Sequence, residues 1–307
     1  MGSILNPLYY AVSWVMVTFH SLLGYIFGKD SNASIKWSLS IIGLVIVIRI
    51  ILIPLFVKQI KSQRALTALQ PHMKEIQKKY KDDRQKQSEE MMKLYKEHKT
   101  NPLASCFPIL AQAPIFFALF TVLNGIARDV PHGVLKGDLL VSAREAKFFG
   151  ANLSNTFLSS DSNTQTKLIT VVLIVFMSAT TFITQRQLMV KGMPKMDSSN
   201  NMMLQQQKIM LYVFPIIFAV SGVNFPVGVL LYWSTTNLWT FGQQFYVIKR
   251  NPTPGSPAYE ELMKKRELKN KDSGLPTKDE PGTTQVDPTN EQPKQRQQPS
   301  KKKKKRK

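Results

Sequence analysis

The sequence predicts an all-α integral membrane protein with a core of five spanning helices. Its apolar residues are gathered in long runs, and three of these carry no charge: 100–127, 168–185 and 209–248. A fourth run, 37–57, contains one charged residue, Arg49. A helix of about 20 apolar residues crosses the hydrocarbon core, so the longest run is sufficient for two crossings.

The charged residues between these runs predict how the chain is oriented. Segment 58–100 carries 12 Lys and Arg against 6 Asp and Glu, and 249–307 carries 17 against 8. Segment 186–208 carries 4 against 1, whereas 126–165 carries 4 of each. Because positive loops are retained in the cytoplasm, we expect the first three segments to face inward and the neutral segment to face outward.

Five spans fit this orientation in an unbroken alternation of direction, and with the loops between them they form a core domain, residues 31–250. The last two spans are joined at Ser221–Gly228, where glycines and a proline predict a tight outer hairpin. The predicted spans cover about 35–57, 103–125, 167–186, 208–224 and 226–248.

Residues 1–30 form a separate N-terminal segment that is also predicted to be helical. Residues 4–27 carry no charge, but spaced polar residues fall near one helical face: Asn6, Ser13, His20 and Gly24. This pattern favours an amphipathic helix lying in the outer membrane interface, with a sixth span as the alternative. The five core spans are the same in either case.

Segment 58–100 is predicted to be a cytoplasmic hairpin of two antiparallel helices. Apolar residues recur there at spacings of three and four, which is a helical pattern, and Pro71 should kink the first helix. Asp82 and Asp83 end that helix and can cap the second, since Asp82 lies three residues before Gln85. We expect a docking or gating arm, the alternative being a solvated basic connector.

Arg49 is the residue that most directly indicates a functional site. It lies nine residues before Lys58, so its backbone is roughly 13 Å below the inner membrane boundary. A charge at that depth costs about 2.5–3.5 kcal/mol, and the predicted spans contain no Asp or Glu to neutralise it. Arg49 is therefore expected to face a hydrated cavity and to receive an acidic ligand.

Uncharged polar side chains in the second, third and fifth spans can line such a cavity. The alternative for each of them is a structural role in holding helices together, which hydroxyls and amides often have in membranes. The residues are Gln112, Ser178, Thr180, Thr181, Thr184, Gln185, Ser234, Thr235, Thr236, Asn237, Thr240, Gln243 and Gln244.

Several motifs resemble those of one known family over roughly residues 5–250. They are IRIILIPL at 48–55, LQP at 69–71, NPLASCFPILAQAPIFF at 101–117, TFITQRQ at 181–187 and NFPVGVLLYW at 224–233. In combination they resemble the YidC/Oxa/Alb membrane protein insertase family, in its simpler Gram-positive, actinobacterial-like form. The resemblance implies a five-helix insertase core in the bacterial plasma membrane, with a cytoplasmic hairpin, an outer interfacial helix and a hydrophilic groove.

The resemblance also assigns groove residues that would contact a substrate. The family's membrane arginine, which receives the substrate's hydrophilic tail, corresponds to Arg49, and its groove aromatic in the last span corresponds to Trp233, next to Tyr232. A groove glutamine of the third span falls at Thr184 or Gln185. With Gln112 of the second span, these residues make up the predicted substrate-binding set.

The C-terminal segment, 251–307, is rich in Pro, Gln and charged residues and is predicted to be a disordered cytoplasmic tail. Its last seven residues are all cationic: Lys301, Lys302, Lys303, Lys304, Lys305, Arg306 and Lys307. Such a run binds polyanions, so we expect contact with ribosomal RNA, the alternative being a solvated charge that fixes topology.

These features together predict an insertase, and not an enzyme, that receives nascent membrane proteins and releases their helices into lipid, alone or with the Sec channel and the signal-recognition-particle pathway. No cofactor or metal is expected. An intramembrane enzyme is disfavoured because the spans contain no His, Asp or Glu, and a small-solute transporter because there is no internal repeat or ion-coordinating acid.

Overall fold

In the computed structural model the described part of the chain is mostly helical, as the sequence predicts. The structure describes residues 2–28, 31–98, 100, 107–159, 163–192 and 202–272. The helices are α1 (Gly2–Phe27), α2 (Ala33–Ile51), α3 (Ile53–Ala68), α4 (Gln70–Lys79), α5 (Arg84–Glu97), α6 (Phe107–Arg128), α7 (Asp138–Glu145), α8 (Thr164–Gln187), η2 (Leu188–Gly192, π-helical), α9 (Met202–Gly222), α10 (Val227–Arg250) and α11 (Pro257–Asp272).

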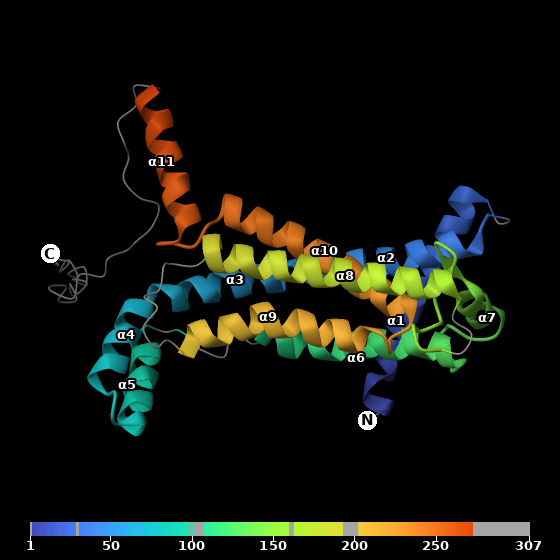
Figure 1. Cartoon of the computed structure of the whole chain (residues 1–307), viewed down its shortest axis with the longest axis horizontal. Helices are drawn as coiled ribbons and strands as arrows, with labels where there is room; N and C mark the ends of the chain where they lie inside the picture. The colour runs from blue at the N-terminus through green and yellow to red at the C-terminus, as the bar shows by residue number, and fades with distance from the viewer. Residues whose placement is uncertain are drawn as a thin grey trace, which may run out of the picture. The chain divides into compact units, whose positions relative to one another are not determined.

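Five of these helices, α2, α6, α8, α9 and α10, correspond to the five predicted spans, and Figure 1 shows them running side by side. Ala33–Ile51 and Thr164–Gly192 are long and apolar enough to cross a membrane. Gln112–Arg128 and Leu211–Gly222 are shorter apolar stretches. The turn between α9 and α10 confirms the predicted hairpin at Ser221–Gly228.

The first predicted span, 35–57, is not one uninterrupted helix. It consists of α2 and the beginning of α3, which are separated at Leu52. The cause is Pro54, which has no N–H to donate to the carbonyl of Ile50 and whose ring crowds that carbonyl. The chain resumes a helical course at once, with the Phe56 N–H donating to the Leu52 carbonyl at 3.1 Å.

The predicted cytoplasmic hairpin is present as α4 and α5, with two differences from the sequence prediction. Pro71 lies in the first turn of α4, so α3 ends before it instead of continuing with a kink. Asp83, and not Asp82, caps α5, since its Oδ1 accepts from the Lys86 N–H at 3.0 Å. The Tyr95 hydroxyl contacts the Met73 sulfur at 3.8 Å and joins the two helices.

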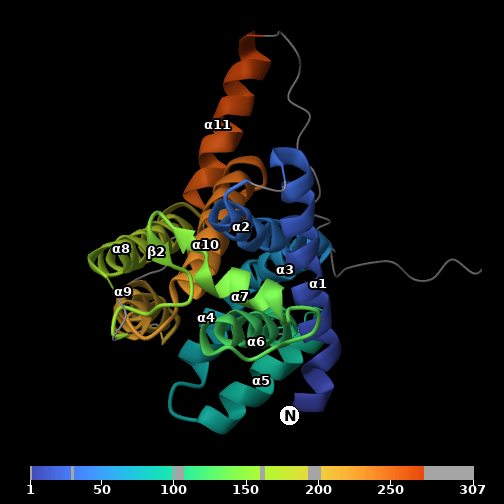
Figure 2. The same ribbon diagram turned by 90° about the vertical axis from the view of Figure 1, so that its right-hand side faces the viewer.

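Helix α1 crosses the other helices instead of running parallel to them, as Figures 1 and 2 both show. This direction is consistent with a helix in the membrane interface. Leu5–Phe27 is nevertheless long and apolar enough to span, so the interfacial position remains a prediction. The helix packs against α2 and α6.

The residues between α6 and α8 form an ordered cap, which we call the outer segment (129–159) because its charge balance predicts that it faces outward. It contains α7 and a hairpin of β1 (Lys147–Phe148) and β2 (Ala151–Asn152), paired antiparallel. Backbone and hydroxyl hydrogen bonds join this segment to three helices. They are Val134 N to Ser13 Oγ (3.0 Å), Lys147 N to Ser34 Oγ (2.9 Å), Trp37 Nε1 to Ser142 Oγ (3.0 Å), Val227 N to Asn155 O (3.0 Å) and Gly228 N to Leu153 O (2.8 Å).

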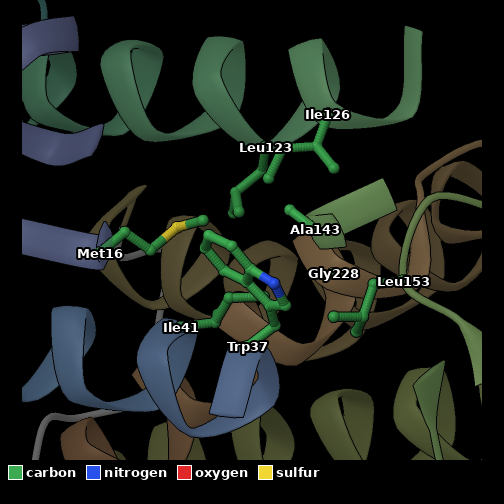
Figure 3. Close-up of a pocket in the computed structure, with 8 residues that line it drawn as sticks. All are labelled: Met16, Trp37, Ile41, Leu123, Ile126, Ala143, Leu153 and Gly228. Atoms are coloured by element: carbon green, nitrogen blue, oxygen red, sulfur yellow. The ribbon is translucent and has the colours of Figure 1, made fainter. Parts of the chain in front are cut away.

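The buried core lies beneath this cap, around the indole of Trp37. Figure 3 shows Trp37 enclosed by Met16 of α1, Ile41 of α2, Leu123 of α6 and Ala143 of α7. The void left among these side chains is only about 10 Å³, so this part of the molecule is tightly packed.

The prediction of disorder from residue 251 does not hold for its first part, because 257–272 form α11. Ser256 caps this helix, with its Oγ accepting from the Tyr259 N–H at 3.3 Å, and Pro257 occupies the first helical position. The Glu, Leu and Lys residues that follow favour helix, and composition alone does not reveal this. The predicted RNA-binding residues Lys301–Lys307 lie outside the described part of the chain.

Candidate functional site

The guanidinium of Arg49 faces a cavity of about 220 Å³. The cavity is bounded by α2 and α3, by η2 and by the last three turns of α10, together with the residues after α10. Its polar lining consists of Arg49, Gln59, Thr240, Gln243, Gln244, Asn251 and Thr253, and its apolar lining includes Phe56, Ile60, Leu188, Val247 and Ile248.

The position of the cavity follows from helical spacing across the break at Leu52. Phe56, Gln59 and Ile60 lie seven, ten and eleven residues after Arg49, which returns them to the same face of a nearly continuous helix. On α10 the lining residues Thr240, Gln243, Gln244, Val247 and Ile248 are spaced by three and four in the same way. Two partly polar helix faces are therefore turned toward each other.

Arg49 has aromatic neighbours and, within the described part of the chain, no acidic partner. Its guanidinium carbon lies 5.5 Å from the centre of the Phe56 ring, a cation–π distance. On α10, Tyr232 is within electrostatic reach of Arg49 and interacts with the Thr236 side chain. Among the residues that the structure describes, no Asp or Glu forms an ion pair with Arg49.

An unneutralised cation in a small, partly polar cavity is suited to hold an anion for a limited time. The described residues contain no group of three or more His, Cys, Asp or Glu that could hold a metal ion. The arrangement therefore favours reversible binding of a negatively charged group.

A model of the 60Kd inner membrane protein family matches residues 28–254, most of the chain. The chain belongs to this family. A member named membrane protein insertase YidC, from Streptomyces avermitilis, is 58% identical over 255 residues, which are 80% of this chain but only 59% of that longer protein. A second, from Tropheryma whipplei strain Twist, is 37% identical over 286 residues, covering 88% of this chain and 92% of that protein.

A solved structure described as an active YidC insertase with its first transmembrane domain resolved is also similar to this chain. The identity is 26% and the TM-score 0.47, over 78% of this chain and 46% of that one. As a 60Kd inner membrane protein, the chain is an integral protein of the bacterial cell membrane, as its apolar runs predict. Its relatives are named as insertases and not as enzymes.

In this member of the 60Kd family, one other predicted groove residue lies near Arg49. Tyr232 is buried, with 4% of its surface exposed, and lies within electrostatic reach of the arginine. The next residue, Trp233, points to a different side of α10 and packs among Phe116 of α6, Phe218 of α9 and Phe225. A step of about 100° per residue along the helix accounts for this difference.

Three further predicted residues do not line the Arg49 cavity. Thr184 is buried and its hydroxyl donates to the Thr180 carbonyl at 2.6 Å, a bond within its own helix. Gln185 lies beside it on α8, and Gln112 is partly buried on α6. The cavity lining includes none of the three.

Other polar residues of the spans join neighbouring helices, which is the structural role considered as the alternative to lining a cavity. Asn237 of α10 donates to Thr181 Oγ1 of α8 at 3.1 Å, which joins the two helices. The hydroxyls of Thr235 and Thr240 donate to carbonyls four residues earlier in α10 itself, so these two bonds do not join helices, and Thr240 also lines the cavity. Ser178 of α8 donates to the Pro215 carbonyl of α9 at 3.4 Å.

Sequence reasoning did not identify Gln59, or the residues after α10, as part of the cavity. For Gln59 the signal is its ten-residue separation from Arg49, which would have placed it on the arginine's face had the helix been followed past Leu52. No comparable signal exists for Asn251 and Thr253, since their position depends on how the chain turns after α10.

Proposed function

We propose that this chain is a membrane protein insertase that receives a hydrophilic, acidic part of a nascent membrane protein at Arg49 and releases the adjoining apolar helix into lipid. One observation carries the proposal: Arg49 faces a polar-lined cavity and forms no ion pair among the described residues. The names of the Streptomyces and Tropheryma relatives support it.

The free energies involved are consistent with transient binding. A charge-assisted hydrogen bond contributes about 1.5–3 kcal/mol, which is enough to select an acidic segment but allows rapid release. A membrane potential positive outside favours the outward passage of each negative charge by about 2.3 kcal/mol per 100 mV. Burial of the substrate's apolar helix in lipid supplies the remaining driving force, so no nucleotide is required.

The other lining residues have complementary roles in this proposal. Gln59, Gln243 and Gln244 offer amide donors and acceptors to a polar backbone that has left water. Tyr232 and Phe56 hold the guanidinium toward the cavity. Gln112, Thr184, Gln185 and Trp233 remain predicted substrate contacts elsewhere on the bundle, where Trp233 lies with Phe116 on a face of aromatic residues.

The topology and partners of the insertase are part of the same proposal. We place α3, α4, α5 and the tail in the cytoplasm, on the strength of the positive charge of 58–100 and 249–307. Lys301–Lys307 would contact ribosomal RNA, and the Sec channel and the signal-recognition-particle pathway are candidate partners. The hydrophilic lining would open toward this side.

The experiment is an insertion assay in a bacterial strain depleted of its own insertase. Two single-span substrates are compared, one with acidic residues in its translocated tail and one with these changed to Asn or Gln. Arg49→Ala should lower insertion of the acidic substrate by roughly tenfold, the loss of one charge-assisted contact, and leave the neutral substrate nearly unchanged.

The matched control is Arg128→Ala, which removes an exposed arginine at the end of α6. It should leave both substrates inserted, because Arg128 does not line the cavity. Equal insertion of the acidic substrate by the wild type and by Arg49→Ala would contradict the proposed role of the arginine. Loss of both substrates together would instead indicate a general defect of folding.

A further inference from the structure

A second cavity lies next to the Arg49 cavity, and the role proposed for Arg49 does not account for it. It is a groove of about 640 Å³ between α3 and α10, which we call the α3–α10 groove. Its lining is mainly apolar and includes Ile53, Val57 and Ile60 of α3 and Leu238, Gly242 and Tyr246 of α10. Five residues border both cavities: Phe56, Ile60, Gln243, Val247 and Asn251.

The groove lies beyond the helix break at Leu52, between the first half of α3 and the second half of α10. Within the described residues, α10 packs closely on α2 but not on α3. Ile53 and Val57 are each 46% exposed, and Leu238 and Tyr246 are more than half exposed. A Cβ atom added at Gly242 would meet no other atom within 4 Å, so the space above this glycine is open.

One end of the groove is basic. The lining residues of α10 recur at spacings of three and four up to Tyr246 and Val247, and the same stripe continues into Lys249 and Arg250. Both cations are exposed, and Lys249 Nζ lies 5.9 Å from the Phe245 ring. On α3, the exposed Lys58 directly follows the lining residue Val57.

The length of the groove corresponds to one leaflet of a bilayer. Arg250 lies twelve residues after Leu238, which corresponds to about 18 Å of helix. Half of the hydrocarbon core is roughly 15 Å thick. An aromatic residue near the basic end is typical of the membrane–water interface, and Tyr246 occupies this position. The Trp239 indole N–H donates to Gln243 Oε1 at 3.1 Å, so the ring does not need a hydrogen-bond acceptor from an occupant.

We propose that the α3–α10 groove is a binding site for one anionic phospholipid, with its acyl chains along the apolar trough and its phosphate at Lys249, Arg250 and Lys58. An anionic phospholipid fits both features, because its acyl chains are apolar and its phosphate is negative. A wholly apolar partner helix would leave the cationic end without a partner. Basic residues at the membrane surface attract anionic lipids by about fivefold in affinity for each cation. A lipid held here covers the wall formed by Phe56 and Val247 and separates the Arg49 cavity from bulk hydrocarbon.

The test is native mass spectrometry of the purified full-length chain in detergent, with phosphatidylglycerol and phosphatidylcholine added in equal amounts. The wild type should retain one phosphatidylglycerol in preference to phosphatidylcholine. Gly242→Trp fills the open space above the glycine and should abolish this retention. Ile216→Trp, at an exposed apolar position on α9, is the matched control and should retain the lipid as the wild type does.

A second variant, Lys249→Gln with Arg250→Gln, keeps the groove open and removes two cations. It should weaken phosphatidylglycerol retention by about fivefold for each cation while leaving phosphatidylcholine retention unchanged. Equal retention of the two lipids by the wild type, or unchanged retention in Gly242→Trp, would overturn the proposal. So would a photocrosslinker at position 238 that forms adducts with protein and none with lipid in membranes.

Discussion

The two ends of the helix bundle are built differently. At the end covered by the outer segment, Trp37 and its neighbours leave a void of about 10 Å³, and loop hydrogen bonds hold α1, α2 and α10 together. At the opposite end of the bundle, which carries Lys249 and Arg250 and which we call the basic end, α10 borders two cavities of about 220 and 640 Å³. Tight packing and hydrogen bonding are thus concentrated at one end, and accessible polar and apolar surfaces at the other.

This difference shows how one bundle can be both stable and open to a substrate. The capped end supplies the contacts that keep the helices together, so the basic end does not need to be closely packed. Substitutions at the capped end should therefore lower stability, whereas substitutions at the basic end should alter binding with little effect on stability. The predictions below test this division.

The largest effect is expected for Trp37→Ala. Trp37 is 1% exposed, stacks on His20 with ring centres 4.1 Å apart and donates to Ser142. Its removal should lower the free energy of unfolding by about 3–5 kcal/mol, measured by unfolding in mixed micelles of mild detergent and dodecyl sulfate. Trp239→Ala, in the α3–α10 groove, should lower the free energy of unfolding clearly less. Equal losses in the two variants would contradict the division between a tightly packed end and an open end.

Two glycines should respond in opposite directions to the same change. Gly133 has φ +59°, and a Cβ there would contact Ser13 Oγ and lie 2.8 Å from the Tyr10 Cα, so Gly133→Ala should destabilise by about 1–3 kcal/mol. Gly242 lies within α10 with open space above it, so Gly242→Ala should stabilise by about 0.5–1 kcal/mol. The melting temperatures of the two variants should fall on opposite sides of the wild type.

The most local effect is expected in the α4–α5 hairpin, which belongs to neither end of the packed bundle. Asp83→Ala removes the N-cap of α5 and should destabilise that helix by about 1 kcal/mol. Amide hydrogen exchange should accelerate in residues 84–97 and not in α2 or α10. Asp82→Ala is the matched control, and a larger effect at Asp82 would show that the cap is assigned to the wrong residue.

The sequence was informative wherever one physical effect dominates. Long charge-free runs locate the spans because an unpaired charge in hydrocarbon is costly, and Arg49 is identifiable because it is the single exception in its run. Tyr232 was predicted to be a groove residue, and in the structure it is buried within electrostatic reach of Arg49. The cap of α5 was predicted within one residue, since Asp82 and Asp83 are equally good caps in isolation.

Features that depend on tertiary contacts were harder to predict. Polar residues at similar spacings on α10 have different roles: Gln244 lines the cavity, whereas Asn237 bonds to α8. Tyr232 and Trp233 were both predicted to contact a substrate, and the structure shows that, as adjacent residues on a helix, they have different neighbours. The order of the outer segment likewise arises from hydrogen bonds to α1, α2 and α10, which its own composition does not specify.

The central claim is that the cavity at Arg49 is filled with water, and thiol labelling tests it most directly. Cys106 is the chain's one cysteine, so Cys106→Ser provides a background for single cysteines at Gln244, in the cavity, and at Ile216, on an exposed apolar face. Maleimide reacts with the thiolate, which forms only in water. We predict rapid labelling at position 244 and very slow labelling at 216, and equally slow labelling at both would show that the cavity is dry.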